Sequence, residues 1–138
     1  MKTIVIIHNL NSRGKNINED YVRELLNKKG MKFHYFQTKQ ISDVDEIIKK
    51  YNNPSEFQYC SIGGDGSLNA LVNSLMKNNI ILPEVSCLPG GSGSDFIRTF
   101  ALPQNIEEAV EHLIFDNFYE VDVGPVSYTH LTLPTKQP

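Results

Sequence analysis

Short apolar runs rich in β-branched residues alternate along the chain with segments whose apolar residues recur at helical spacing. The predicted strands are residues 4–7, 32–37, 57–62, 84–88 and 119–123. The first predicted helix begins at Asn18 or Asp20, and the others cover residues 42–51, 67–77, 94–100 and 105–115. This alternation favours a three-layer, Rossmann-like α/β fold, in which a mostly parallel sheet carries helices on both faces.

The first predicted helix carries signals at both ends. Asn18 or Asp20 can cap its start, and Lys28-Lys29-Gly30 is typical of a helix end. The apolar face that is expected to pack inward consists of Tyr21, Val22, Leu25 and Leu26.

The chain has 138 residues, 40% of them hydrophobic, which is enough for one domain with its own core. A net charge of −3 argues against a nucleic-acid partner. With no signal peptide and no apolar stretch long enough to span a membrane, we expect a cytoplasmic protein. Cys60 and Cys87 form no CxxC pair and are expected to be reduced. Because His8, His34 and His112 lack metal-ligand spacing, they are expected to be structural.

The alternation of elements stops at Gly124. Residues 126–135 match one reading frame of a transposase adaptor used in sequencing libraries, and Pro125 fits the joining codon. We therefore predict that residues 125–138 are read-through foreign to the native chain, and that residues 1–124 are one domain of a truncated protein. The alternative is a natural polar tail. Under either interpretation, Tyr128 and His130 have no role in a site.

A glycine-rich turn, Gly63-Gly64-Asp65-Gly66-Ser67, joins a predicted strand to a helix. Glycine permits positive φ and lets an anion approach backbone N–H groups, toward which the positive end of the helix dipole also points. Asp65 would act there through Mg²⁺, through a hydrogen bond, or as an acid or base. Asn69 lies one helical turn further on. The alternative is a structural turn in which Asp65 or Ser67 caps the helix.

A second turn, Pro89-Gly90-Gly91-Ser92-Gly93, follows the next predicted strand. Ser92 and Ser94 offer hydroxyl groups to a phosphate, and Asp95 offers a carboxylate to a metal-bound phosphate or a substrate hydroxyl. Arg98 lies three residues beyond Asp95, so its alternative role is a local ion pair. Two such turns at the ends of two strands are expected to face one crevice.

The paired turns resemble the diacylglycerol kinase catalytic domain family, which includes the sphingosine and ceramide kinases. The family sequence Gly-Gly-Asp-Gly-Thr-Leu-Asn-Glu corresponds to residues 63–70 here, and Pro-x-Gly-Thr-Gly-Asn-Asp-Phe corresponds to residues 89–96. The family loop Asn-Pro-x-Ser-Gly corresponds to Asn9 to Gly14, and Thr38 lies where the family has a threonine that contacts the nucleotide. The resemblance covers residues 3–124.

This resemblance implies a lipid kinase of phospholipid biosynthesis that transfers the γ-phosphate of ATP to a hydroxyl of diacylglycerol or a sphingoid base, with Mg²⁺ as cofactor. The ATP-binding residues that it implies are Asn9, Ser12, Thr38, Gly63, Gly64, Asp65, Gly66, Ser67, Asn69 and Ser92. It also implies catalytic roles for Asp65 and Asp95, and Asp65 is the candidate metal ligand. The family's general base lies in a following domain, so we expect this chain to bind nucleotide weakly without turnover. The full-length protein is expected to contact the membrane peripherally, and a homodimer is left open.

Several positions depart from the family sequence. Ala70 replaces a glutamate, Ser94 an asparagine and Leu10 a proline, whereas Ser67 and Ser92 keep the hydroxyl of threonine. Two alternatives therefore stay open. One is an enzyme similar to NAD kinase or 6-phosphofructokinase, which also carry Gly-Gly-Asp-Gly, and the other is a nucleotide-binding module without activity.

Overall fold

The computed structural model describes residues 2–10, 17–89, 105–114, 118–122 and 130–134. In chain order, the elements are β1 (Thr3–Asn9), α1 (Glu19–Lys28), β2 (Phe33–Thr38), α2 (Ile41–Lys50), β3 (Phe57–Gly63), α3 (Asp65–Lys77), β4 (Val85–Pro89), α5 (Ile106–Ile114), β5 (Phe118–Asp122) and β6 (His130–Pro134). The helix predicted over residues 94–100 lies outside the described residues.

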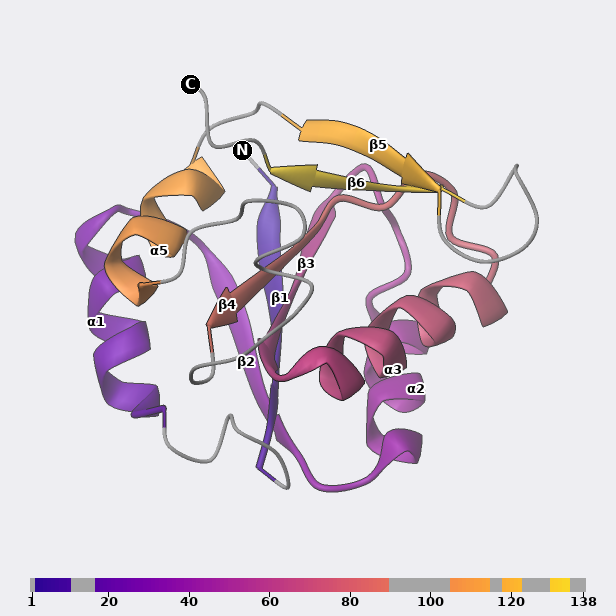
Figure 1. The fold of residues 1–138 in the computed structure, drawn as a ribbon, viewed down its shortest axis with the longest axis horizontal. Helices are drawn as coiled ribbons and strands as arrows, with labels where there is room; N and C mark the ends of the chain where they lie inside the picture. Colours follow the sequence, from indigo (N-terminus) through magenta and orange to yellow (C-terminus); the bar gives the residue numbers. More distant parts are fainter. Residues whose placement is uncertain (1, 11–16, 90–104, 115–117, 123–129, 135–138) are drawn as a thin grey trace.

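Strands β1 to β4 form a parallel sheet in the order β2-β1-β3-β4 (Figure 1). Helices α2 and α3 cover one face, and α1 and α5 cover the other. Because the central strands β1 and β3 are buried on both faces, their sequences are nearly continuous apolar runs. The predicted α/β fold is confirmed, and the boundaries of the described elements differ from the predicted ones by one or two residues.

Each face of the sheet has its own apolar core. The core under α2 and α3 contains Val5, Ile7, Val44, Ile48, Tyr59, Leu68, Leu71, Val72, Leu75, Ile80 and Val85. The core under α1 and α5 contains Ile4, Ile6, Val22, Leu26, Met31, Cys60, Ile62, Leu88, Ala109, Val110 and Leu113. Successive residues of β1 and β3 alternate between the two cores, as the pleat of a strand requires. These two cores fix the helices against the sheet and thereby place the strand ends.

Helix α1 begins and ends as its sequence predicts. The side chain of Asn18 accepts a hydrogen bond from the backbone N–H of Tyr21 at 3.2 Å. At the other end, Gly30 has φ of +70°, and the N–H of Met31 reaches the carbonyl of Leu26 at 3.1 Å. With the bond from Gly30 N–H to the carbonyl of Asn27 at 3.0 Å, this is a Schellman motif. The cap and the stop are therefore local features, readable from sequence.

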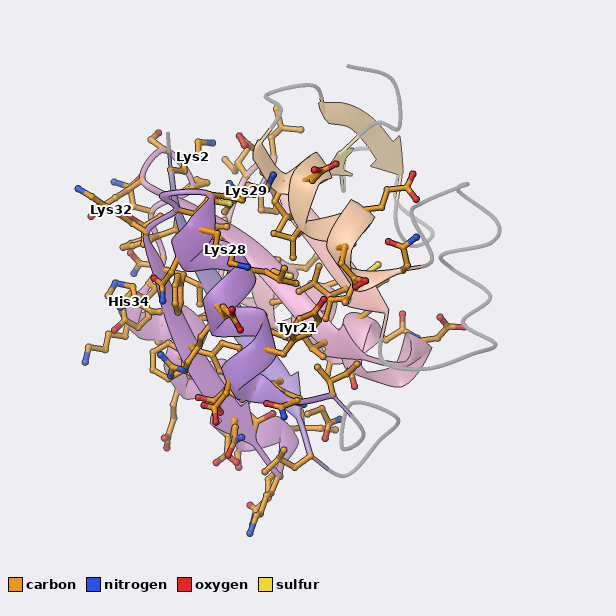
Figure 2. All side chains as sticks on the ribbon, turned by 90° about the vertical axis from the view of Figure 1, so that its left-hand side faces the viewer. Lys2, Tyr21, Lys28, Lys29, Lys32 and His34 are labelled. Carbon is orange, nitrogen blue, oxygen red and sulfur yellow. The ribbon has the colours of Figure 1, made fainter. Side chains whose placement is uncertain are left out.

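The prediction of the inward face of α1 is wrong at one residue. Val22 and Leu26 are buried and Leu25 is partly buried, but Tyr21 is 41% exposed. Figure 2 shows Tyr21 on the α5 side of α1, and a hydrogen bond with Glu107 helps to raise the pKa of its hydroxyl, after the effect of burial. The phenol ring thus lies at the edge of the core, because its hydroxyl finds a partner on the neighbouring helix.

Strands β5 and β6 form an antiparallel pair apart from the main sheet (Figure 1). Residues 130–134, where no strand was predicted, therefore form β6. Leu131, Thr132 and Leu133 alternate in polarity, which suits a strand, and β5 offers the edge with which they pair. That this tail is foreign to the native chain stays a prediction.

The cysteines and two of the histidines have structural surroundings. Cys60 and Cys87 are both free, as predicted, and burial raises the pKa of each thiol to about 12. His8 is buried and its Nδ1 lies 2.6 Å from the hydroxyl of Tyr35. His34 is exposed and its ring lies 4.9 Å from that of Tyr51. These contacts account for both histidines without a metal, whereas the side chain of His112 lies outside the described part of the chain.

Candidate functional site

The order of the strands creates a crevice between β1 and β3. The chain leaves β1 toward α1 on one face of the sheet, and it leaves β3 toward α3 on the other face. The two connections diverge from neighbouring strands, so the carboxyl ends of β1 and β3 form a topological switch point. Ligands of open α/β sheets bind at such a point. Figure 1 shows this end of the sheet, where β1 ends and α3 begins.

The junction between β3 and α3 is tighter than the sequence predicts. Helix α3 begins at Asp65 rather than at Ser67, so the turn itself consists of Gly63 and Gly64. Gly63 has φ of +152°, a backbone conformation that residues other than glycine rarely adopt. Gly66 has no positive φ and is a residue of the first helical turn. Among the described glycines of this junction, positive φ is therefore required at Gly63.

No side chain caps the start of α3 at Gly64. The carbonyl of Gly64 accepts hydrogen bonds from the N–H groups of Ser67 and Leu68, at 3.1 and 3.2 Å. Gly64, and not Asp65 or Ser67, occupies the N-cap position of this helix. A helix start without a side-chain cap presents its first N–H groups and the positive end of its dipole to a ligand.

A hydrogen bond joins the end of β1 to the first turn of α3 across the switch point. The side-chain amide Nδ2 of Asn9 donates to Oγ of Ser67 at 3.0 Å, and Ser67 is 6% exposed. Thr38 ends β2 beside Asn9 and is buried, and its carbonyl accepts from the N–H of Leu10 at 2.9 Å. The structure thus gathers Asn9, Thr38, Gly63 and Ser67, which the resemblance assigns to ATP, within one group of strand ends.

Asn9, Thr38 and Ser67 help to line a small cavity of about 70 Å³, hereafter the inner cavity. Its lining residues are Ile7, Asn9, Thr38, Lys39, Gln40, Ile41, Val44, Ser67 and Ala70. Sequence reasoning missed the turn of Lys39, Gln40 and Ile41 between β2 and α2. The signal was available, because this turn follows a parallel strand at its carboxyl end. Ala70 was noted only as a departure from the family sequence.

On the α1 face of the sheet, a series of polar contacts supports the end of β1. His8 is bonded to the Tyr35 hydroxyl, and the guanidinium of Arg23 lies 5.0 Å from the centre of the Tyr35 ring. Nε of Arg23 donates to Glu19 at 2.6 Å. Burial, and then the nearby charge of Glu19, raise the pKa of the Tyr35 hydroxyl. The Tyr35 hydroxyl therefore stays protonated at neutral pH, and its contact with His8 holds the strand that carries Asn9.

Asp65 lies in the first turn of α3 and is partly exposed. Its carboxylate contributes, after burial and Cys60, to the raised pKa of Cys87, which locates it near the end of β4. Among the described residues, no group of three or more histidine, cysteine or acidic side chains could hold a metal ion. A single carboxylate is nevertheless compatible with Mg²⁺, which keeps several waters and commonly shares one or two carboxylates with substrate phosphates.

The remaining predicted site residues are in two groups. Asn69 is exposed on α3, one turn beyond Asp65, and does not line the inner cavity. Ser12, Ser92 and Asp95 lie outside the described residues. In the part of the chain that the structure describes, no helix is long and apolar enough to cross a membrane.

Other proteins resemble this chain in sequence and in structure. The chain is 29% identical over 127 residues to a Streptococcus pneumoniae protein named "Putative lipid kinase", a match that covers 90% of this chain and 42% of that protein. It is 36% identical over 100 residues to a Staphylococcus haemolyticus protein with the same type of name, with 67% and 32% of the two chains covered. The chain thus spans less than half the length of these relatives.

A crystal structure described as a "putative diacylglycerol kinase" from Bacillus anthracis superposes with a TM-score of 0.70 at 25% identity. The superposition covers 94% of this chain and 46% of that one. The sequence model of the diacylglycerol kinase catalytic domain matches residues 3–126. The strand ends, the uncapped start of α3 and this match over nearly the whole chain lead to one conclusion: the chain belongs to the diacylglycerol kinase catalytic domain family.

Proposed function

We propose that the full-length protein is an ATP-dependent lipid kinase and that this chain supplies its ATP-binding part. The observation that carries the proposal is the bond from Asn9 to Ser67, which joins the end of β1 to the first turn of α3, whose N-cap residue is Gly64. The lipid kinase family and a crevice at a topological switch point support the same function. A lipid hydroxyl, of diacylglycerol or of a sphingoid base, is the proposed acceptor.

Phosphoryl transfer depends mainly on positioning and on neutralising charge. The N–H groups at the start of α3 would bind phosphate oxygens, and the helix dipole would favour their negative charge. A side chain at Gly66 would meet no protein atom within 4 Å, so the space beside this turn is open to a ligand. Asn9 and Ser67 would hold the nucleotide from the side of β1, and Thr38 from the side of β2.

Bound Mg²⁺ would offset the negative charge of the phosphates. Asp65 is the described residue that suits it, because it stands at the helix start where the phosphates would lie. Ser12, Ser92 and Asp95 are proposed to complete the nucleotide and acceptor sides. The proton of the attacking hydroxyl would go to a base outside this chain.

The lysines at the end of α1 give little support for membrane contact by this chain. Lys28 and Lys29 lie close together in Figure 2, and each is within 3.5 Å of a glutamate, Glu24 and Glu111 respectively. Their charges are therefore largely balanced. We propose that peripheral membrane contact belongs to the rest of a cytoplasmic full-length protein, where the lipid would enter. A homodimer is compatible with this proposal but is not required by it.

The test is a phosphoryl-transfer assay with γ-labelled ATP and Mg²⁺. The full-length protein is offered diacylglycerol, sphingosine and NAD as acceptors, and this 138-residue chain is tested beside it. We expect the full-length protein to label a lipid and this chain to bind ATP weakly without transfer. Labelling of NAD alone would favour the NAD kinase-like alternative. Robust lipid phosphorylation by the 138-residue chain would contradict the proposal that the base lies outside it.

One observation favours a second function. Ala70 lines the inner cavity where the family sequence has a carboxylate, so a charged group of the site is absent. A nucleotide-binding module without activity would tolerate this loss. ATP binding by the full-length protein without transfer to any acceptor would support that function.

A further inference from the structure

The last residue of β1 that pairs with both neighbouring strands is a buried histidine. His8 pairs with Gln37 of β2 and with Ile62 of β3, where the pairing of β1 with β3 ends. Its side chain is 1% exposed and lies on the α1 face, where Ile4 and Ile6 occupy the preceding positions of the same strand. A buried imidazole loses the water that would bind its nitrogens, so it needs partners inside the protein. A histidine at this position therefore replaces apolar packing with a directional bond.

Tyr35 of β2 provides that bond. Nδ1 of His8 lies 2.6 Å from the Tyr35 hydroxyl, and the two rings meet edge to face with their centres 5.7 Å apart. The bond crosses from β1 to β2 out of register, because His8 pairs with Gln37, whereas Tyr35 pairs with Ile6. A diagonal bond of this kind resists both sliding and twisting of one strand against the other. It therefore fixes the end of β1 more firmly than the backbone bonds of the sheet do alone.

Helix α1 holds the tyrosine ring in place. The guanidinium of Arg23 lies 5.0 Å from the centre of the Tyr35 ring and 5.7 Å from that of Phe33. Nε of Arg23 donates to Glu19, one helical turn earlier, at 2.6 Å, and this bond keeps the guanidinium over the two rings. Because α1 is itself packed against the sheet, the ring of Tyr35 is fixed from the helix, and His8 is fixed from Tyr35.

The next residue, Asn9, makes its contact on the opposite face of the sheet. Successive side chains of a strand point to opposite faces, so Asn9 points toward α3, where it donates to Ser67 at 3.0 Å. The backbone of Asn9 pairs with Thr38 of β2, one residue beyond the end of the pairing with β3. The position of the Asn9 amide therefore depends on how firmly the residue before it is held.

We propose that His8 and Tyr35 are positioning residues of the ATP site, because their bond holds the end of β1 in the orientation from which Asn9 reaches the nucleotide. This inference rests on the proposed function and adds two residues that act through Asn9 rather than on ATP itself. The bond lies on the α1 face of the sheet, whereas the inner cavity lies on the α3 face. Removal of the Tyr35 hydroxyl therefore affects ATP through β1.

The test is equilibrium binding of ATP with Mg²⁺ to the 138-residue chain and its variants. Tyr35→Phe removes the hydroxyl and keeps the ring, and should weaken ATP binding by about fivefold, the loss of one neutral hydrogen bond. Asn9→Ala should weaken it by about tenfold. Adding Tyr35→Phe to Asn9→Ala should weaken binding by less than about twofold further, because the group that Tyr35 positions is already absent.

Tyr59→Phe is the matched control. The Tyr59 hydroxyl also makes a bond of 2.6 Å, to the carbonyl of Tyr51, but Tyr59 pairs with Val5, three residues before His8 on β1. Its loss should lower the free energy of unfolding, measured with urea, and leave ATP affinity unchanged. A second comparison uses His8 itself. His8→Asn keeps an amide that can bond with the phenol and should retain more ATP affinity than His8→Leu, which keeps bulk without a polar group.

Three results would overturn the proposal and leave the proposed ATP site standing. The first is unchanged ATP affinity in Tyr35→Phe. The second is an equal loss of affinity in Tyr35→Phe and Tyr59→Phe, which would show that binding simply follows the stability of the fold. The third is full additivity of Tyr35→Phe and Asn9→Ala, which would show that Tyr35 does not act through Asn9. If the unsubstituted chain binds no ATP, the proposed function fails and this inference fails with it.

Discussion

Replacing Ser67 with alanine tests the bond that joins the end of β1 to the first turn of α3. The hydroxyl of Ser67 is 6% exposed and accepts from Asn9 at 3.0 Å. The substitution removes this acceptor while leaving the backbone of α3 intact. Because Ser67 also lies beside the helix start, its loss should affect nucleotide binding more than folding.

The two effects have different sizes. A neutral hydrogen bond contributes about 1 kcal/mol to stability, and alanine is a better helix former than serine by roughly 0.5 kcal/mol. The expected net loss of stability is therefore about 0.5 kcal/mol, or a few degrees of Tm at most. Hydrogen bonds to charged groups contribute about 1.5–3 kcal/mol, so we expect ATP affinity to fall by about tenfold or more.

Urea unfolding and titration with ATP measure the two quantities on the same samples. Ser67→Thr keeps the hydroxyl and should retain most of the affinity. Ser55→Ala, an exposed serine in the turn before β3, is the matched control and should change neither quantity. Unchanged ATP affinity in Ser67→Ala would refute the role given to this hydroxyl. A loss of stability near 3 kcal/mol with proportionate loss of binding would refute the separation of binding from folding.

Three further predictions concern the core. Tyr59→Phe removes the part-buried hydrogen bond of 2.6 Å from the Tyr59 hydroxyl to the carbonyl of Tyr51. The free energy of unfolding, measured with urea, should fall by about 1–2 kcal/mol. An unchanged urea midpoint would contradict this prediction. Leu71→Ala should cost about 3 kcal/mol or more of unfolding free energy, because Leu71 is fully buried on the inner face of α3. Leu71→Met should cost under about 1.5 kcal/mol. Burial raises the pKa of Tyr59, Cys60 and Cys87 to about 12. The unfolded chain therefore loses these protons at lower pH than the folded protein does. The free energy of unfolding should keep its full value below about pH 9 and fall progressively toward pH 12. Urea midpoints that do not change over this range would show that these groups do not control the stability.

Local signals were sufficient to predict most elements. Asn18 caps α1 and Gly30 ends it through bonds within a few residues, so both features are readable in the sequence. The buried runs of β1 and β3 follow from their apolar composition. The glycine-rich turn was recognised too, although its helix begins at Asp65, two residues earlier than predicted. That error arose because the glycines at 63, 64 and 66 look alike in sequence, while positive φ falls on Gly63.

The sequence by itself determined the class of fold, the position of the glycine turn and the family resemblance, because each depends on residues close together in the chain. The tertiary structure decided which residues meet. The order β2-β1-β3-β4 brings Asn9 to Ser67, which is 58 positions away. It also left Tyr21 at the edge of the core and gave β6 a partner in β5. Such contacts depend on long-range packing of both faces of the sheet, which no local pattern encodes.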